Sequence, residues 1–256
     1  MSTDASTVVH ALLAAPPTQP LITFYDDATG ERVELSGATL GNWVAKTANL
    51  LVDGQGLAPG EVAAVRLPPH WLTAAVLLGC WVAGLRVDLT GEGAGADGAG
   101  GADGAGAGGA DGAGAGGADG AAVAFVAGDV EPPAADEVFA LSLAPLGMPF
   151  RGGPPAGTLD FSVEVRQYGD RMPPVRAEPG QVAIADGTTH AGLLAAAVGR
   201  GVPRGTRVLV DGDAHPDPVA WLLAPLVAGS PVVLCRHLDP ALLDARLAAE
   251  RAIRWP

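Results

Sequence analysis

Lysine is nearly absent from this chain. Lys46 is the single lysine among 256 residues, and every other basic residue is an arginine. Acidic residues outnumber basic ones by 28 to 15, which gives a formal net charge of −13. Because nucleic acids and anionic membranes attract basic surfaces, this balance argues against both as partners. The scarcity of lysine also restricts any chemistry that needs an ammonium group beside nucleotide phosphates.

Long apolar runs, cysteines and signal-peptide features are also scarce. The longest apolar stretch, residues 71–85, is shorter than the roughly 20 residues that a membrane helix needs. The N-terminus lacks the basic start of a secretory signal. Cys80 and Cys235 lie in apolar segments, where two buried thiols are favoured over a disulfide. These features predict a cytoplasmic protein.

Strands and helices are predicted to alternate along most of the chain, which is 48% hydrophobic. The first part predicts a hairpin of strands 21–25 and 32–35, a helix over 36–52, and a βαβ unit over 61–67, 70–83 and 85–89. Further strands are predicted at 122–127 and 138–143, while 159–166 fits an edge strand or the start of a helix. From residue 182 the predicted order is strand 182–185, helix 190–198, strand 206–210, helix 217–228, strand 231–235 and helix 239–250. The fold class is therefore α/β, with parallel or mixed sheets flanked by helices.

A glycine-, alanine- and aspartate-rich segment over 91–120 separates two α/β parts, 1–90 and 121–256. It repeats GGADGAGA with a period of eight and contains no aromatic or β-branched residue. Such a segment cannot bury enough surface to offset its ordering entropy, so we interpret it as a low-complexity linker or insertion. The two flanking parts are expected to pack together as one domain.

A strand–turn–helix segment over 181–207 is the first candidate site. In α/β proteins the free N–H groups at such a helix start bind phosphates. The candidate positions are Asp186, Gly187, Thr188, Thr189 and His190. A working phosphate loop also needs several glycines and a lysine, whereas this turn has one glycine and no lysine.

Three patterns in the first 90 residues point to a known family. A helix carries Leu40, Trp43, Ala45, Ala48 and Leu51. A loop and strand follow, with Gly56, Leu57, Pro59, Gly60, Val62, Val65, Leu67 and Pro68. The next helix has Ala75, Leu78, Gly79, Trp81, Ala83 and Gly84. Together they resemble the opening of the superfamily of AMP-forming acyl-CoA synthetases, luciferases and nonribosomal-peptide adenylation domains. The amino-acid sequence of this part is also similar to that of a group of short proteins without an assigned activity, which resemble the N-terminal region of these adenylate-forming enzymes.

The second half resembles the same superfamily around Thr189 and His190, which match the Thr-His pair and apolar helix after the family's phosphate loop. The loop itself is reduced to Asp186, Gly187 and Thr188. The family's aromatic-x-x-Thr-Glu motif, ribose-binding aspartate motif and C-terminal domain have no counterpart here. The pattern predicts that a strand begins within residues 252–256, as if a longer architecture continued.

The resemblance therefore favours a degenerate, non-catalytic homologue with no catalytic residue, which could still bind ATP, AMP or an acyl ligand. One alternative is an active, ATP-dependent carboxylate-adenylating ligase whose phosphate site is rebuilt from Arg200, Arg204 or Arg207. Another is a structural or regulatory protein that pairs its sheet edge at 254–256 with a protein partner.

Single polar residues have plainer interpretations beside the functional ones. His190 is a candidate nucleotide or carboxylate contact, but such a residue more often caps a helix or makes structural hydrogen bonds. Asp186 in a turn usually forms an Asx-turn rather than a metal site. A polar cluster follows the predicted strand 206–210 and could hold a divalent cation, or could simply cap the next helix; it comprises Asp211, Asp213, His215 and Asp217. We predict no metal site.

Overall fold

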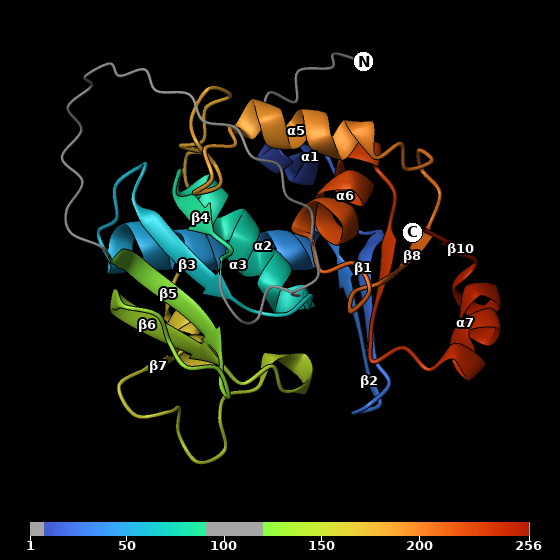
Figure 1. The fold of residues 1–256 in the computed structure, drawn as a ribbon, viewed down its shortest axis with the longest axis horizontal. Helices are drawn as coiled ribbons and strands as arrows, with labels where there is room; N and C mark the ends of the chain where they lie inside the picture. The colour runs from blue at the N-terminus through green and yellow to red at the C-terminus, as the bar shows by residue number, and fades with distance from the viewer. Residues whose placement is uncertain (1–7, 91–119, 256) are drawn as a thin grey trace, which may run out of the picture.

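The computed structural model describes residues 8–90 and 120–255, which form two five-stranded sheets with helices between and around them (Figure 1). Residues 91–119 of the glycine-rich segment lie outside the described residues, so its interpretation as a linker or insertion stays a prediction. In the part that is described, no helix has the length and apolar character needed to cross a bilayer.

Sheet A contains the predicted hairpin and the strands of the C-terminal half. Its order is β10 (Ile253–Arg254), β8 (Val208–Asp211), β9 (Val232–Arg236), β1 (Pro20–Asp26) and β2 (Glu31–Ser36). β1 and β2 are antiparallel, with Phe24 opposite Val33, which confirms the hairpin. The other neighbouring pairs are parallel, so the sheet is mixed as expected.

Sheet B is parallel throughout. Its order is β4 (Arg86–Asp88), β3 (Val62–Arg66), β5 (Ala121–Ala127), β6 (Ala135–Leu141) and β7 (Leu159–Asp160). β3 and β4 are parallel neighbours in the sheet, and in the chain they directly precede and follow helix α3, which confirms the predicted βαβ unit. Parallel strands usually need a helical crossover, yet residues 128–134 join β5 to β6 without a helix.

Helix α3 (Trp71–Val82) forms the centre of the core, because every one of its residues is buried. It lies between the two sheets and packs against α2 (Gly37–Asn49) (Figure 1). The hydroxyl of Ser36 caps α2 by accepting from the Thr39 amide at 3.1 Å, as the sequence predicts. α2 continues into a π-helical turn, Leu50–Gly54. Cys80 on α3 and Cys235 on β9 are both buried free thiols.

The remaining helices cover the two faces of sheet A and the far end of sheet B. α1 (Val8–Leu13), α5 (His190–Gly199) and α6 (Ala224–Ala228) contact one another on one side of sheet A (Figure 1). α7 (Leu243–Glu250) packs Leu243 and Leu247 against the opposite face. A π-helical turn, Val219–Leu223, leads into α6. The short elements are α4 (Phe161–Glu164) and the 3₁₀ turns Pro145–Gly147, Val165–Gln167 and Pro240–Leu242.

The structure differs from the sequence prediction in two segments. Residues 182–185 form no regular strand; Ile184 makes an isolated parallel bridge to Val87 of β4, and Val182 makes an isolated antiparallel bridge to Thr189. The amides of Ala183 and Ile184 both donate to the carbonyl of Thr188, at 2.8 and 3.1 Å, so the chain closes into a turn. Over 159–166 both alternatives occur in part, because β7 is followed directly by α4.

Candidate functional site

The turn before α5 uses its polar side chains for local hydrogen bonds. Asp186 Oδ1 accepts from the Thr188 amide at 2.8 Å, which is an Asx-turn. Thr189 caps α5 by accepting from the Gly192 amide at 3.1 Å. Gly187 takes a φ of +96°, a conformation that side chains disfavour. All of these contacts serve the local structure of the turn.

The backbone donors of the same turn are also engaged within the chain. Gly187 N–H donates to the Ile184 carbonyl at 3.0 Å. At the start of α5, the His190 and Ala191 amides donate at 3.0 and 2.9 Å to the carbonyls of Gln181 and Pro179. A phosphate-binding helix start needs amides that point at the ligand. Here these amides would first have to break hydrogen bonds to the protein.

His190 is fully buried where α5 begins. Neither of its ring nitrogens has a hydrogen-bond partner. Burial lowers the pKa of His190 to about 4, because the charged imidazolium would lose its hydration. His190 is therefore a neutral core residue, and it does not line the cavity described below.

The basic residues considered for a phosphate site lie in different environments. Lys46 Nζ donates to the carbonyl of Tyr168 at 2.6 Å, so the single lysine anchors a loop. Arg207 donates to Thr23 Oγ1 at 2.8 Å and pairs with Glu250 at 2.9 Å, between β8 and the strands and helix beside it. Arg204 is exposed. Among the three candidate arginines, Arg200 alone lines a cavity.

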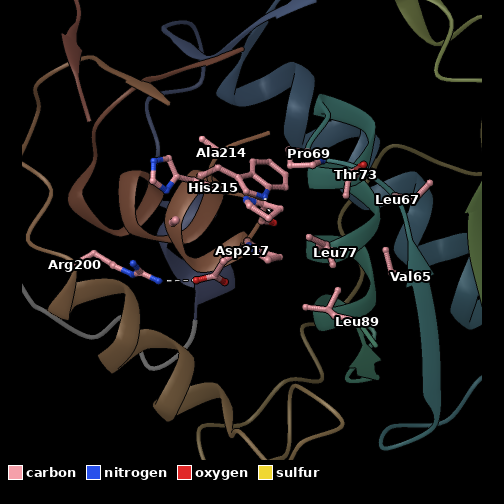
Figure 2. Close-up of a pocket in the computed structure, with 14 residues that line it drawn as sticks. Val65, Leu67, Pro69, Thr73, Leu77, Leu89, Arg200, Ala214, His215 and Asp217 are labelled. Atoms are coloured by element: carbon pink, nitrogen blue, oxygen red, sulfur yellow. Dashed lines mark hydrogen bonds and ion pairs between the residues drawn. The ribbon is translucent and has the colours of Figure 1, made fainter. Parts of the chain in front are cut away.

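A cavity of about 370 Å³ lies where the carboxyl ends of β3 and β4 face the loop that follows β8 (Figure 2). Ligand sites in α/β proteins are usually found outside the carboxyl ends of strands. Leu77 and Leu89 lie on one side of the space and Asp217 on the other, with Arg200 reaching Asp217 at the edge (Figure 2). The lining consists of Val65, Leu67, Pro69, Thr73, Leu77, Leu89, Arg200, Ala214, His215, Pro216, Asp217, Pro218, Ala220 and Trp221.

The polar cluster that follows β8 is split between this cavity and a separate hydrogen-bond network. His215 and Asp217 line the cavity. Asp211 accepts from the amides of Asp213 and Ala214, at 3.2 and 3.3 Å. Asp213 in turn accepts from the Arg236 guanidinium, at 3.0 Å. Across residues 8–90 and 120–255, no group of three or more His, Cys, Asp or Glu is placed to hold a metal ion.

Sequence reasoning found His215 and Asp217 but missed the apolar wall of the cavity. Val65, Leu77 and Leu89 belong to strongly apolar segments, and their pattern is the same as that of ordinary core residues. The positions of Leu67 and Leu89 could have indicated the site, because they directly follow strands β3 and β4, and ligands usually bind at the carboxyl ends of strands in this fold class.

A curated relative matches almost the whole chain. It is described as a TIGR03089 family protein of Mycobacterium tuberculosis (strain ATCC 25618 / H37Rv). The two sequences are 38% identical over 262 residues, which cover 99% of this chain and 98% of the relative. No family model matches the sequence.

Solved adenylate-forming enzymes share the fold at low sequence identity. An acyl-CoA synthetase from Brucella canis superposes with a TM-score of 0.68 and 15% identity, over 96% of this chain and 46% of the synthetase. The N-terminal domain of FACL13 from Mycobacterium tuberculosis superposes with a TM-score of 0.60 and 12% identity, over 96% of this chain and 61% of that domain. The chain thus spans about half the length of the synthetase. Its fold is that of the N-terminal region of the AMP-forming acyl-CoA synthetases, as the sequence patterns implied.

Proposed function

The chain belongs to the TIGR03089 family, and we propose that it is a non-adenylating homologue of the AMP-forming acyl-CoA synthetases that retains a small-molecule pocket. The observation that carries the first half of this proposal is the closed turn before α5. The amides of Gly187, His190 and Ala191 all donate to carbonyls of the chain itself.

Adenylation develops negative charge on the oxygens of the attacked phosphate and on the leaving pyrophosphate, so it depends on preorganised donors. The loss of one such donor typically costs about 3–4 kcal/mol, or more than a hundredfold in rate. In this turn the Thr188 amide is also taken, by Asp186 Oδ1. Freeing these donors would break the hydrogen bonds that hold the turn, which supports a protein that does not activate carboxylates.

The alternative of an arginine-based ligase needs a guanidinium that can move to a phosphate. Arg207 pairs with Glu250, a carboxylate whose side chain is only 6% exposed and which also pairs with Arg32, so releasing Arg207 would remove one of the two cations that neutralise a buried charge. Arg200 pairs with Asp217 at 2.6 Å. Both arginines are therefore matched by carboxylates, which favours the non-adenylating proposal.

The cavity supports the second half of the proposal. Its volume of about 370 Å³ is within the range of small-molecule sites, and its walls are mostly apolar with a few polar groups at the edge. A compact acyl-like molecule is the class of ligand that such a space accommodates. ATP or AMP would have to bind without phosphate donors from the turn.

ATP–pyrophosphate exchange with a panel of carboxylic acids tests the non-adenylating half directly. We expect no exchange above the background of a chain-free control, and no heat of binding when millimolar ATP or AMP is titrated. Exchange with any carboxylate would overturn the proposal. Replacement of Arg200, Arg204 and Arg207 one at a time would then identify the rebuilt site.

Leu89→Trp is the matched variant for the pocket. Leu89 is partly exposed and lines the cavity, so a larger side chain there fills the space without entering the fully buried core. We expect this variant to unfold with the same midpoint as the wild type and to lose binding of small apolar compounds. Unchanged binding in Leu89→Trp would place the ligand elsewhere.

A further inference from the structure

The two buried polar side chains that line the cavity, Thr73 and Trp221, offer a ligand no free hydrogen-bond donor. Thr73 Oγ1 donates to the Pro68 carbonyl at 2.7 Å. Trp221 Nε1 donates to the Pro216 carbonyl at 3.2 Å. Because both donors are already used, the apolar walls are complemented by an apolar group, and a charged group placed among them would lose its hydration without compensation.

The mouth of the cavity carries one charge of each sign. Arg200 Nη2 lies 2.6 Å from Asp217 Oδ2, and both side chains are 47% exposed. Asp217 Oδ1 also accepts from the Val219 amide at 2.9 Å, at the start of the helical turn that leads into α6. This second bond holds the aspartate in place, so its negative charge remains beside any head group that approaches Arg200.

The pair changes what Arg200 can recognise. An unpaired guanidinium at the mouth of an apolar pocket would bind a carboxylate through charge-assisted hydrogen bonds. Here Asp217 occupies that position, and a ligand carboxylate would meet a fixed like charge and an overall chain charge of −13. An uncharged head group avoids both the repulsion and the desolvation of an anion.

We infer that this cavity selects apolar molecules with an uncharged head group, such as a primary amide or an ester, and discriminates against the corresponding free carboxylate. The inference rests on the ligand-binding half of the proposed function and assigns its ligand class. Asp217 is the specificity-determining residue, and it acts by neutralising Arg200.

A matched pair of probes tests this selectivity. Phenylacetamide and phenylacetate have the same ring and differ in the charge of the head group. Calorimetric titration at pH 8 should give binding of phenylacetamide that is at least about tenfold tighter than that of phenylacetate. Equal or tighter binding of phenylacetate would overturn the inference.

Asp217→Asn is the decisive variant, because asparagine keeps the Oδ1 acceptor for the Val219 amide and removes the charge. We expect its affinity for phenylacetate to rise about tenfold, while its affinity for phenylacetamide changes less than about threefold. Arg200→Gln should weaken phenylacetate binding further. Unaltered selectivity in Asp217→Asn would contradict the inference even if the wild type prefers the amide.

The controls separate this inference from the proposed function. If neither probe binds at about 10 mM, or if Leu89→Trp binds both as well as the wild type does, the cavity is not their site and the inference fails. The ATP–pyrophosphate exchange assay uses neither probe, so the non-adenylating half of the proposed function stands or falls on its own result.

Discussion

The two ends of helix α5 differ in their surroundings, because the first end is closed by hydrogen bonds within the chain and the second lies beside a cavity. At its first turn, the amides of His190 and Ala191 donate to carbonyls of the preceding segment, and Thr189 caps the helix. Just beyond its last turn, Arg200 is half exposed at the mouth of a cavity. The first end is where the family resemblance places a phosphate loop, but the open volume is at the second. A ligand site requires space, and here the second end borders the cavity whereas the residues of the turn at the first end do not line it.

The largest expected effect concerns the cavity end, because its wall is also part of the core. Trp221 is 1% exposed, so Trp221→Ala should lower the free energy of unfolding by about 3–5 kcal/mol through the lost burial and the enlarged cavity. Urea denaturation measures the loss. Val198→Ala on the exposed face of α5 is the matched control and should change stability by less than about 0.5 kcal/mol. A loss below about 1 kcal/mol in Trp221→Ala would mean that the cavity can collapse around the smaller side chain.

The second effect concerns the first end of α5 and depends on pH. Burial places the pKa of His190 at about 4 in the folded chain, below the ordinary value near 6.5 that it regains on unfolding. The unfolded state therefore takes up the proton first as pH falls. Stability from this residue is complete above about pH 6.5, declines down to about pH 4, and changes no further below that, a total of about 3 kcal/mol.

His190→Leu isolates this contribution, since leucine fills a similar volume and has no proton to bind. We expect the variant to equal or exceed the wild type in stability at pH 7, because the imidazole nitrogens have no partners to lose. Between pH 6.5 and 4 its stability should fall less steeply than that of the wild type. Parallel stability–pH curves for the two proteins would show that His190 is hydrated in the folded state.

A smaller effect tests whether the turn is purely structural. Thr189→Ala removes the acceptor for the Gly192 amide and should cost about 1 kcal/mol, whereas Thr189→Ser keeps the cap and should cost a few tenths. Calorimetric titration with AMP should give no heat for the wild type or for either variant. An affinity for AMP that falls with Thr189→Ala would show that this end of α5 contacts a ligand.

The fold was predictable where local pattern and long-range pairing agree. The hairpin of β1 and β2 and the unit β3–α3–β4 follow from apolar periodicity and turn residues. The strand predicted over 182–185 is reduced to a single parallel bridge with β4 for a local reason, because the Ala183 and Ile184 amides donate to the Thr188 carbonyl instead of extending the ladder. The β-propensity of these residues favoured a strand, but the hydrogen bonds of the turn determine the conformation that they adopt.

The site was only partly predictable, because its properties arise from residues that are distant in sequence. Asp217 and His215 were noticed because they follow a strand. Their significance depends on Leu77 and Leu89, which belong to a different sheet and its buried helix. The partnership of Arg200 with Asp217 crosses a loop and a strand, and no spacing rule links the two residues.

The smallest expected effect on stability concerns the Arg200–Asp217 pair at the second end of α5, and it contrasts with the effects expected at the first end. The Arg200–Asp217 pair is 47% exposed on both sides, so Arg200→Gln should change the free energy of unfolding by less than about 0.5 kcal/mol, because water already screens the pair. Urea denaturation checks this value, with Arg204→Gln on the exposed loop nearby as the control. A loss of more than about 1 kcal/mol in Arg200→Gln alone would show that the pair fastens α5 to the start of the next helix. It would then be a structural clamp like the turn at the first end. A negligible loss would show that the pair contributes little to folding, so that the effect of Arg200 and Asp217 on ligand selection can be measured in variants that fold as well as the wild type.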